Sequence, residues 1–199
     1  MHTFERCIAV GGVALFPSDT VYGLATEPES EEGVRRLYAL KGRPQDRPAA
    51  VMFFDLELAL AALPELGART VGALRALLPG PLTVLVENPA RRFPLACGPD
   101  PRRLGLRVPA LGGALTPLSE ARWPVLQSSA NRSGGPESRR LGDVDRTIRS
   151  GVDLQLDGGE LPGVASTVVD LSGYEPAGSY RVLREGAVSP AAVAARLAA

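Results

Sequence analysis

Three apolar segments of this 199-residue chain end in the same way, in hydroxyl, amide or glycine residues. The polar groups are Ser-Asp-Thr at 18–20 after the run 13–16, Ser-Ser-Ala-Asn-Arg-Ser-Gly at 128–134 after Val125-Leu126, and Ser-Thr at 166–167 after Val164. Each of them alone is typical of an ordinary turn. Open sheets, however, bind ligands beside strand ends, where such groups supply neutral donors and acceptors. Their recurrence therefore predicts an open sheet with a binding site at these ends.

The remaining hydrophobic periodicities predict helices and strands mixed along the whole chain. Helices are expected over about 30–40, 56–63, 68–78, 111–121, 144–150 and 190–197. Strands are expected over about 13–16, 49–54, 82–86, 104–108, 125–128, 154–156, 166–171 and 180–183. The segments 88–103 and 131–142 are expected to be loops. The mixture indicates an α/β (α+β) layered fold with a mixed sheet, in a single domain over residues 1–199.

Composition argues against several function classes. The chain has 22 basic and 22 acidic residues, so its overall charge does not favour nucleic acid. Cys7 and Cys97 are too few and too far apart for a metal site or a disulfide framework. His2, the one histidine, lies in a terminus of the kind that is usually poorly ordered, which argues against a histidine base. Neither a basic leader nor a membrane-spanning apolar run is found, so a cytoplasmic protein is expected.

Four cations stand out by their positions. Lys41 is the only lysine and follows the predicted helix 30–40 together with Arg43. Arg107 lies within an otherwise apolar strand, and Arg184 follows another strand. A cation after a helix is often only a partner of the helix dipole, but a buried guanidinium needs a carboxylate or phosphate. With the hydroxyl and amide groups, these cations predict a phosphorylated ligand and a small polar one, although no P-loop or Rossmann glycine motif is present.

Seven short motifs follow one another along most of the chain. They are Ser-Asp-Thr-Val-Tyr-Gly-Leu at 18–24, Lys-Gly-Arg-Pro at 41–44, Pro-Gly-Pro-Leu-Thr at 79–83, Arg-Val-Pro at 107–109, Ser-Ser-Ala-Asn-Arg-Ser-Gly at 128–134, Ser-Thr-Val-Val-Asp at 166–170 and Arg-Glu-Gly at 184–186. In this order they resemble the YrdC-like family of threonylcarbamoyl-AMP synthases, in its short, single-domain form. The resemblance runs from about residue 8 to residue 186.

The resemblance implies a cytoplasmic nucleotidyltransferase. Such an enzyme uses L-threonine, bicarbonate or CO2, and ATP with Mg2+, and it makes L-threonylcarbamoyladenylate and pyrophosphate. Partner proteins would then transfer the threonylcarbamoyl group to adenosine 37 of tRNAs that read codons beginning with A, and weak binding of tRNA itself is expected. The fold implied is a twisted, open mixed sheet with flanking helices around a large concave cavity.

The resemblance also implies roles for individual residues. Those that would hold threonine are Thr20, Arg107 and Ser166, with Arg107 on the carboxylate. Those that would hold ATP are Lys41, Arg43, Ser129, Asn131 and Arg184, with Lys41 and Arg43 as catalytic cations. Two positions depart from longer members, which have Asn where this chain has Arg47 and a threonine-contacting His where it has Met52. The segment 18–20 is expected to be polar because this strand end forms the floor of the amino-acid cavity.

Two other functions are compatible with the residues. The concave face could bind RNA without catalysis, although aromatic residues, on which single-stranded bases stack, are only 5% of the chain. A related enzyme that forms a carbamoyl adenylate from carbamoyl phosphate is the other alternative, although such domains usually belong to larger multidomain proteins. Assays of pyrophosphate release and of RNA binding distinguish these functions.

Overall fold

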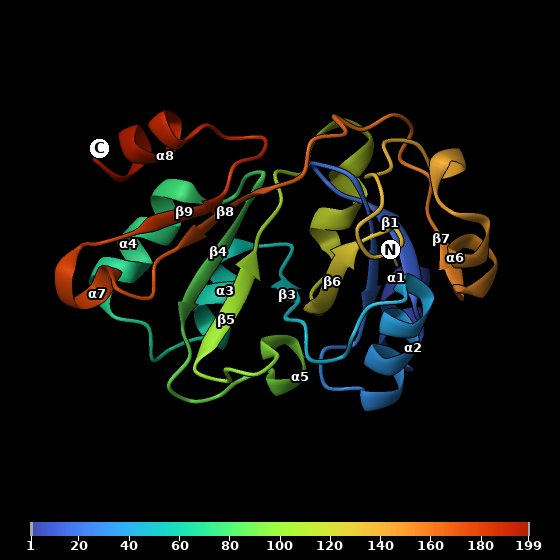
Figure 1. The fold of residues 1–199 in the computed structure, drawn as a ribbon, viewed down its shortest axis with the longest axis horizontal. Coiled ribbons are helices and arrows are strands. Elements are labelled where there is room, and N and C mark those ends of the chain that lie inside the picture. Colours follow the sequence, from blue (N-terminus) through green and yellow to red (C-terminus); the bar gives the residue numbers. More distant parts are fainter. Residues whose placement is uncertain (1, 199) are drawn as a thin grey trace.

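A nine-stranded mixed sheet runs through residues 2–198, the part of the chain that the computed structural model describes (Figure 1). The strands are β1 (Ala14–Pro17), β2 (Tyr22–Thr26), β3 (Ala50–Met52), β4 (Leu82–Glu87), β5 (Arg103–Arg107), β6 (Val125–Ser129), β7 (Leu154–Gln155), β8 (Thr167–Asp170) and β9 (Arg181–Arg184). Their order in the sheet is β7-β1-β2-β6-β3-β5-β4-β8-β9. The pairs β1–β7, β3–β5 and β4–β8 are parallel and the other pairs are antiparallel. The predicted mixed sheet is therefore confirmed.

Helices flank both halves of this sheet, as predicted. They are α1 (His2–Ala9), α2 (Glu31–Lys41), α3 (Leu56–Ala62), α4 (Ala68–Leu77), α5 (Pro94–Cys97), α6 (Arg146–Gly151), α7 (Tyr174–Ala177) and α8 (Pro190–Leu197), with 3-10 turns at Gly113–Glu120 and Leu141–Asp143. Figure 1 shows α4, α7 and α8 near β4, β8 and β9, and α1, α2 and α6 near β1 and β7. Within residues 2–198, no helix combines the length and the apolar character that a bilayer crossing requires.

Local sequence fixes both ends of α2, which carries Lys41. The Ser30 hydroxyl caps the first turn by accepting a hydrogen bond of 3.1 Å from the Gly33 amide. Gly42 adopts a left-handed conformation with φ of 58°, which a residue with a side chain rarely takes, and so ends the helix. The helix therefore stops at Lys41 and holds that side chain at a defined point beside β6.

Several elements differ from the sequence-based predictions. The short helix α5 lies in the segment 88–103, which was expected to be a loop, and α7 was not predicted. The prediction missed β2 because Tyr22–Thr26 is buried on both faces and shows no alternation of apolar and polar residues. The expectation of a poorly ordered N-terminus is wrong from His2 onward, since α1 begins there and buries Phe4. The helix expected over 111–121 is a 3-10 segment, Gly113–Glu120, with Pro117 inside it.

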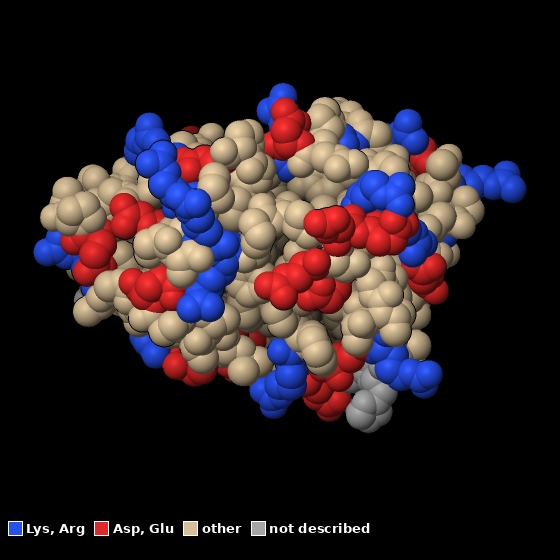
Figure 2. Space-filling model, turned by 90° about the horizontal axis from the view of Figure 1, so that it is seen from below, with Lys and Arg blue, Asp and Glu red and all other residues tan. Residues whose placement is uncertain are grey.

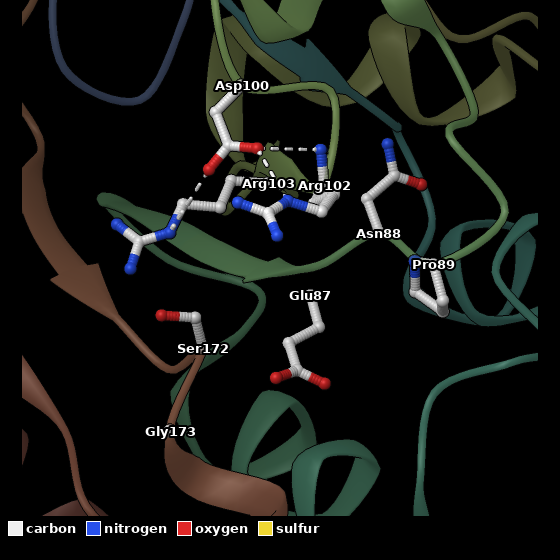
Figure 3. Close-up of a pocket in the computed structure, with 8 residues that line it drawn as sticks. All are labelled: Glu87, Asn88, Pro89, Asp100, Arg102, Arg103, Ser172 and Gly173. Carbon is white, nitrogen blue, oxygen red and sulfur yellow. Dashed lines mark hydrogen bonds and ion pairs between the residues drawn. The ribbon is translucent and has the colours of Figure 1, made fainter.

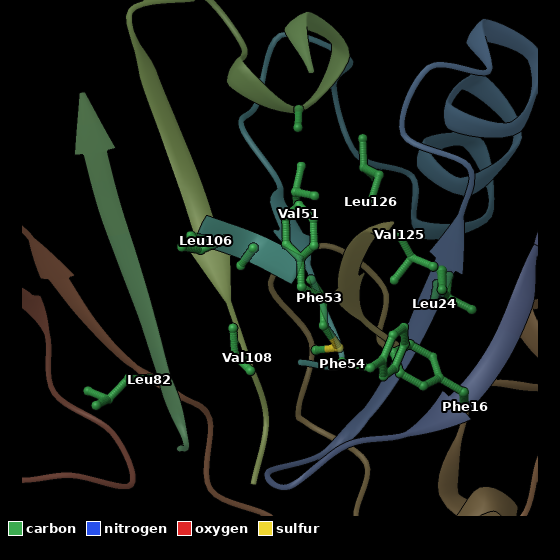
Figure 4. Packing of buried hydrophobic residues seen from close by; sticks show 14 of the residues in the cluster. Phe16, Leu24, Val51, Phe53, Phe54, Leu82, Leu106, Val108, Val125 and Leu126 are labelled. Carbon is green, nitrogen blue, oxygen red and sulfur yellow. The ribbon is translucent and has the colours of Figure 1, made fainter. Parts of the chain in front are cut away.

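The core lies against alternate residues of the central strands. In β4, Leu82, Val84 and Val86 are fully buried, whereas Thr83 and Leu85 are only partly covered. Figure 4 shows side chains of the core cluster, among them Leu82 of β4 and Leu106 of β5. Because successive side chains of a strand point to opposite faces, the intervening residues face a second space on the other side of the sheet. That space is the cavity described next.

Candidate functional site

A cavity of about 280 Å³ lies on the sheet face that Thr83 and Leu85 occupy. Six of the eight predicted site residues line it, namely Thr20, Arg43, Arg107, Ser129, Ser166 and Arg184. The other two, Lys41 and Asn131, are not part of the lining but contact Ser129 directly. The fold thus brings all eight predicted residues, from position 20 to position 184, to one place.

Alternate residues of neighbouring strands form the floor of the cavity. They are Thr83 and Leu85 of β4, Gly105 and Arg107 of β5, Gln127 and Ser129 of β6, and Ser166 and Val168 at the start of β8. A side chain at Gly105 would begin only 3.1 Å from the Ala49 carbonyl oxygen, a tight contact that glycine avoids. The expectation that strand ends alone form the floor is therefore corrected: the face of the sheet forms it, with a period of two residues.

The turn at 18–20 is polar mainly for a structural reason. The Ser18 hydroxyl donates to the Val21 carbonyl oxygen at 2.7 Å and lies 2.9 Å from the Thr20 hydroxyl. Both side chains are fully buried, so these bonds satisfy groups that water cannot reach. Of these three residues only Thr20 lines the cavity. Ser18 therefore holds the turn that presents Thr20.

Arg107 already has a carboxylate partner in the protein. Its Nη2 atom lies 2.8 Å from Asp19 Oδ1 and 3.1 Å from the Thr20 hydroxyl, and Nη1 donates to Gln127 Oε1 at 3.4 Å. Burial raises the pKa of Asp19, and the adjacent Arg107 charge opposes that shift. The Nε atom of Arg107 is shielded from solvent and has no hydrogen-bond partner among the described residues. The guanidinium is thus neutralised on one side and retains unused donor capacity on another.

Lys41 binds the loop after β6. Its ammonium donates to the carbonyl oxygens of Ser129 and Asn131, the latter at 2.9 Å, and to Asn131 Oδ1 at 3.1 Å. Ser129 Oγ donates to the same amide oxygen at 2.6 Å. Burial and the nearby Arg43 charge lower the pKa of Lys41 to about 8, against the opposing charge of Glu137. Its three ammonium donors are all used, so Lys41 fixes the loop from inside the protein.

The buried ammonium of Lys41 predicts a pH dependence of stability. Since the pKa of Lys41 is about 8 in the folded chain and its ordinary value is 10.5, the unfolded chain binds more protons between these pH values. The contribution of Lys41 to the free energy of unfolding therefore becomes more favourable as the pH rises through this window, by up to about 3 kcal/mol. Urea unfolding of the wild type and of Lys41→Met, at pH values near both ends of the window, measures the effect. The difference between the two free energies of unfolding should grow with pH; a constant difference would contradict the prediction.

Two further guanidinium groups line the opposite parts of the cavity. Arg184 Nη2 donates to the Ser166 carbonyl oxygen at 2.8 Å, and Ser166 Oγ lies 2.8 Å from the Thr83 hydroxyl. Arg43 Nη2 donates to the Pro48 carbonyl oxygen at 2.8 Å, and its buried Nε has no partner among the described residues. Arg184 is therefore held by the Ser166 carbonyl oxygen and, at 3.3 Å, by the Ser166 hydroxyl, and Arg43 is held by one backbone oxygen. Both keep donors for an anion.

Sequence reasoning missed one charged residue of the lining, Glu137. It lies in a segment that was expected to be an unremarkable loop, and no spacing in the sequence distinguishes it from an exposed glutamate. The two positions that depart from longer family members are not part of the lining: Met52 is fully buried in β3, and Arg47 is exposed. The departures therefore do not change the side chains that line this cavity.

A second hollow, of about 590 Å³, lies where β4 ends and β5 begins (Figure 3). Its arginines already have acidic partners, because Arg102 Nε lies 3.2 Å from Asp100 Oδ1 and Arg103 Nη1 lies 3.6 Å from Asp170. None of the predicted site residues lines it. The smaller cavity, and not this hollow, is therefore the candidate site.

The chain is similar to known proteins both in sequence and in structure. A threonylcarbamoyl-AMP synthase of Pyrococcus abyssi is 31% identical over 173 residues, which are 85% of this chain and 50% of that protein. A threonylcarbamoyl-AMP synthase of Xanthomonas campestris pv. campestris is 32% identical over 165 residues, which are 79% of this chain and 84% of that protein. The crystal structure of P. abyssi Sua5 complexed with L-threonine matches with a TM-score of 0.81 at 28% identity, over 98% of this chain and 56% of that one.

These matches agree with the order of motifs in the sequence. The chain spans about half the length of the P. abyssi relative and most of the Xanthomonas relative. The sequence profile of the Sua5/YciO/YrdC family, which carries the description "telomere recombination", matches residues 6–186. That match covers both the cavity lining and the sheet that positions it, and the chain belongs to the Sua5/YciO/YrdC family.

Proposed function

We propose that the chain is an L-threonylcarbamoyladenylate synthase, which acts on L-threonine, bicarbonate or CO2, and ATP. The observation that supports this most strongly is one cavity whose lining holds Arg43, Arg107 and Arg184 among small hydroxyl groups. Two relatives are named threonylcarbamoyl-AMP synthases, and a related structure holds L-threonine. The enzyme would act in the cytoplasm and supply its adenylate to proteins that modify adenosine 37 of tRNA.

Threonine would bind at the Arg107 end of the cavity. A carboxylate there can use the guanidinium donors that Asp19 leaves unused, and the Thr20 and Ser166 hydroxyls can bond the polar groups of a small amino acid. Asp19 keeps the buried guanidinium neutralised before substrate arrives. The Thr20–Arg107 contact of 3.1 Å then sets the position of both groups.

ATP would bind toward Arg43, Arg184 and Ser129. The cavity of about 280 Å³ is at the small end of ligand pockets, which typically enclose roughly 300–1,000 Å³. An amino acid together with the reacting phosphate can be enclosed, while the rest of the nucleotide lies over the rim. Lys41 and Asn131 would act by holding the loop that presents Ser129.

Mg2+ would enter with ATP. Among the described residues, no three His, Cys, Asp or Glu side chains come together as a metal site. Mg2+ in nucleotide sites is commonly held by substrate phosphates, water and one or two carboxylates, so such a donor set fits a metal that the nucleotide brings. Bound in this way, it would neutralise phosphate charge, and the chain's own cations would supply the rest.

The proposed chemistry depends on positioning and on charge neutralisation. The neutral amine of threonine attacks CO2, loses a proton and becomes a carbamate. A carbamate oxygen then attacks the α-phosphorus of ATP, the bond to the β,γ-phosphate breaks, and pyrophosphate leaves. Arg43 and Arg184 would stabilise the negative charge that develops on the phosphate oxygens, which is the largest contribution expected in such transfers. No step requires a histidine base.

Pyrophosphate release tests the proposed function. With ATP and Mg2+, release is expected only when threonine and bicarbonate are both present, together with threonylcarbamoyl-AMP detected by mass. Release with carbamoyl phosphate instead would assign the related carbamoyl-adenylate reaction. Salt-sensitive tRNA binding without release would assign an RNA-binding module. The face in Figure 2 carries one narrow band of basic side chains, with acidic side chains on both sides of it.

A further inference from the structure

Glu137 is a carboxylate without a salt bridge in a cavity lined by three arginines. It lines the same cavity as Arg43, Arg107 and Arg184. Among the described residues, none of these cations lies within 4 Å of its oxygens, whereas Asp19, also acidic, pairs with Arg107 at 2.8 Å. Its Oε2 atom is shielded from solvent and accepts no hydrogen bond from the described residues. The fold therefore keeps this charge apart from the cations around it.

A carboxylate oxygen that is shielded from water and makes no hydrogen bond destabilises the folded protein. We therefore expect a ligand to provide its partner. Glu137 is near enough to Lys41 and Arg107 for its charge to counter the burial that lowers the pKa of each. It is thus close enough to influence both cations, although it forms no ion pair with either of them among the described residues. A ligand that carries a positive group can supply what the protein does not.

The proposed reaction offers two positively charged groups that could pair with Glu137. They are the ammonium of the amino acid and Mg2+. An α-amino acid presents a carboxylate and an ammonium a few ångströms apart, and Arg107 and Glu137 offer the opposite charges in one small cavity. An ammonium has three donors, which one carboxylate and neighbouring hydroxyls satisfy. Mg2+ that enters with a nucleotide needs only one or two protein carboxylates, so it is the competing assignment that the test must separate. The presence of Arg107 in the same lining favours the ammonium, because an amino acid needs a partner for its carboxylate as well.

We propose that Glu137 binds the α-ammonium of the amino-acid substrate while Arg107 binds its α-carboxylate. This inference rests on the proposed function and extends it. It assigns the residue that distinguishes threonine from an acid of the same shape without the amino group. Glu137 is on this view a binding residue that holds the amino group in place when threonine binds. The ammonium must then release one proton to solvent water before the neutral amine attacks CO2. It also explains why one acidic side chain persists in a lining that is otherwise suited to anions.

A ligand that lacks only the amino group tests this assignment. We compare L-threonine with 3-hydroxybutanoate of the same configuration at the hydroxyl carbon, by calorimetry without ATP or metal, on the wild type and on Glu137→Gln. Glutamine keeps the size of the side chain and removes its charge. The variant should bind threonine about 10- to 100-fold more weakly, since a charged hydrogen bond is lost. Its affinity for 3-hydroxybutanoate should be unchanged or higher, because a repelling carboxylate is gone.

Controls separate this result from a loss of structure. Glu120→Gln removes an exposed carboxylate outside the cavity and should leave both affinities at the wild-type value. Equal losses for both ligands in Glu137→Gln would overturn the inference, because they would show a structural role. Unchanged threonine binding together with weaker Mn2+ binding in the presence of a non-hydrolysable ATP analogue would also overturn it, in favour of a metal ligand. If the wild type itself binds no threonine, the proposed function fails as well. If the wild type binds threonine and only the Glu137→Gln result disagrees, the inference about Glu137 fails alone.

Discussion

Replacing Arg107 by alanine is expected to reduce threonine-dependent adenylate formation by at least about 100-fold. A carboxylate-binding guanidinium in a closed site contributes both charge and geometry, and losses of this size follow when such a group is removed. The same change leaves Asp19 buried without its partner, so the free energy of unfolding should fall by about 3–5 kcal/mol. Pyrophosphate release and urea unfolding of the same preparation measure the two effects.

A double variant separates the two effects of Arg107. In Asp19→Asn/Arg107→Met the buried charges are removed together, so most of the lost stability should return, because no unpaired ion remains. Threonine binding should not return, since the cation for the substrate carboxylate is still missing. Recovery of both properties in the double variant would show that Arg107 serves only to neutralise Asp19.

The second large effect is expected for Lys41→Ala. The change leaves the Asn131 and Ser129 carbonyl oxygens and Asn131 Oδ1 without their shared donor and removes a positive charge beside the cavity. Turnover should fall by about 100- to 1,000-fold, with weaker ATP binding, because the loop that presents Ser129 loses its anchor. Nucleotide affinity and turnover, measured on folded protein, separate binding from chemistry.

Arg146→Ala is the matched control for Lys41, because it removes a cation that is exposed on α6 and outside the cavity. It should retain wild-type turnover. Wild-type turnover in Lys41→Ala itself would exclude the role given to this residue. Retained ATP affinity with low turnover would place Lys41 in the chemical step and not in the support of the loop.

Much of the fold could be predicted from the sequence because local signals and burial agree. The Ser30 cap and the helical spacing after it located α2 within one residue, and α4 ends before Pro79 as proline requires. The prediction missed β2 because this short segment is buried on both faces and so shows no two-residue alternation. Only pairing with β1 and β6 makes this segment a strand, and pairing is not a local property.

The candidate site was predictable as a set of residues but not as an arrangement. The motifs named Arg107, and burial of a guanidinium called for a partner, yet nothing local identified Asp19 as that partner. Lys41 was expected as a direct ligand of phosphate, and this role stays a prediction, since in the structure its donors bind protein oxygens. Glu137 was missed because its distinguishing property, an unpaired oxygen in a basic cavity, exists only after the chain has folded.

The floor of alternate residues across β4, β5, β6 and β8 has a consequence for folding. Contacts between segments far apart in sequence are made late and slowly. The cavity therefore exists only once the turn that carries Thr20 and the strand that carries Arg184 are both in place. A ligand then binds the native chain alone and stabilises all of it, by about 2.7 kcal/mol at one hundred times its dissociation constant. Ample substrate should therefore slow proteolysis of the chain at every site that opens by global unfolding, far beyond the residues that it touches.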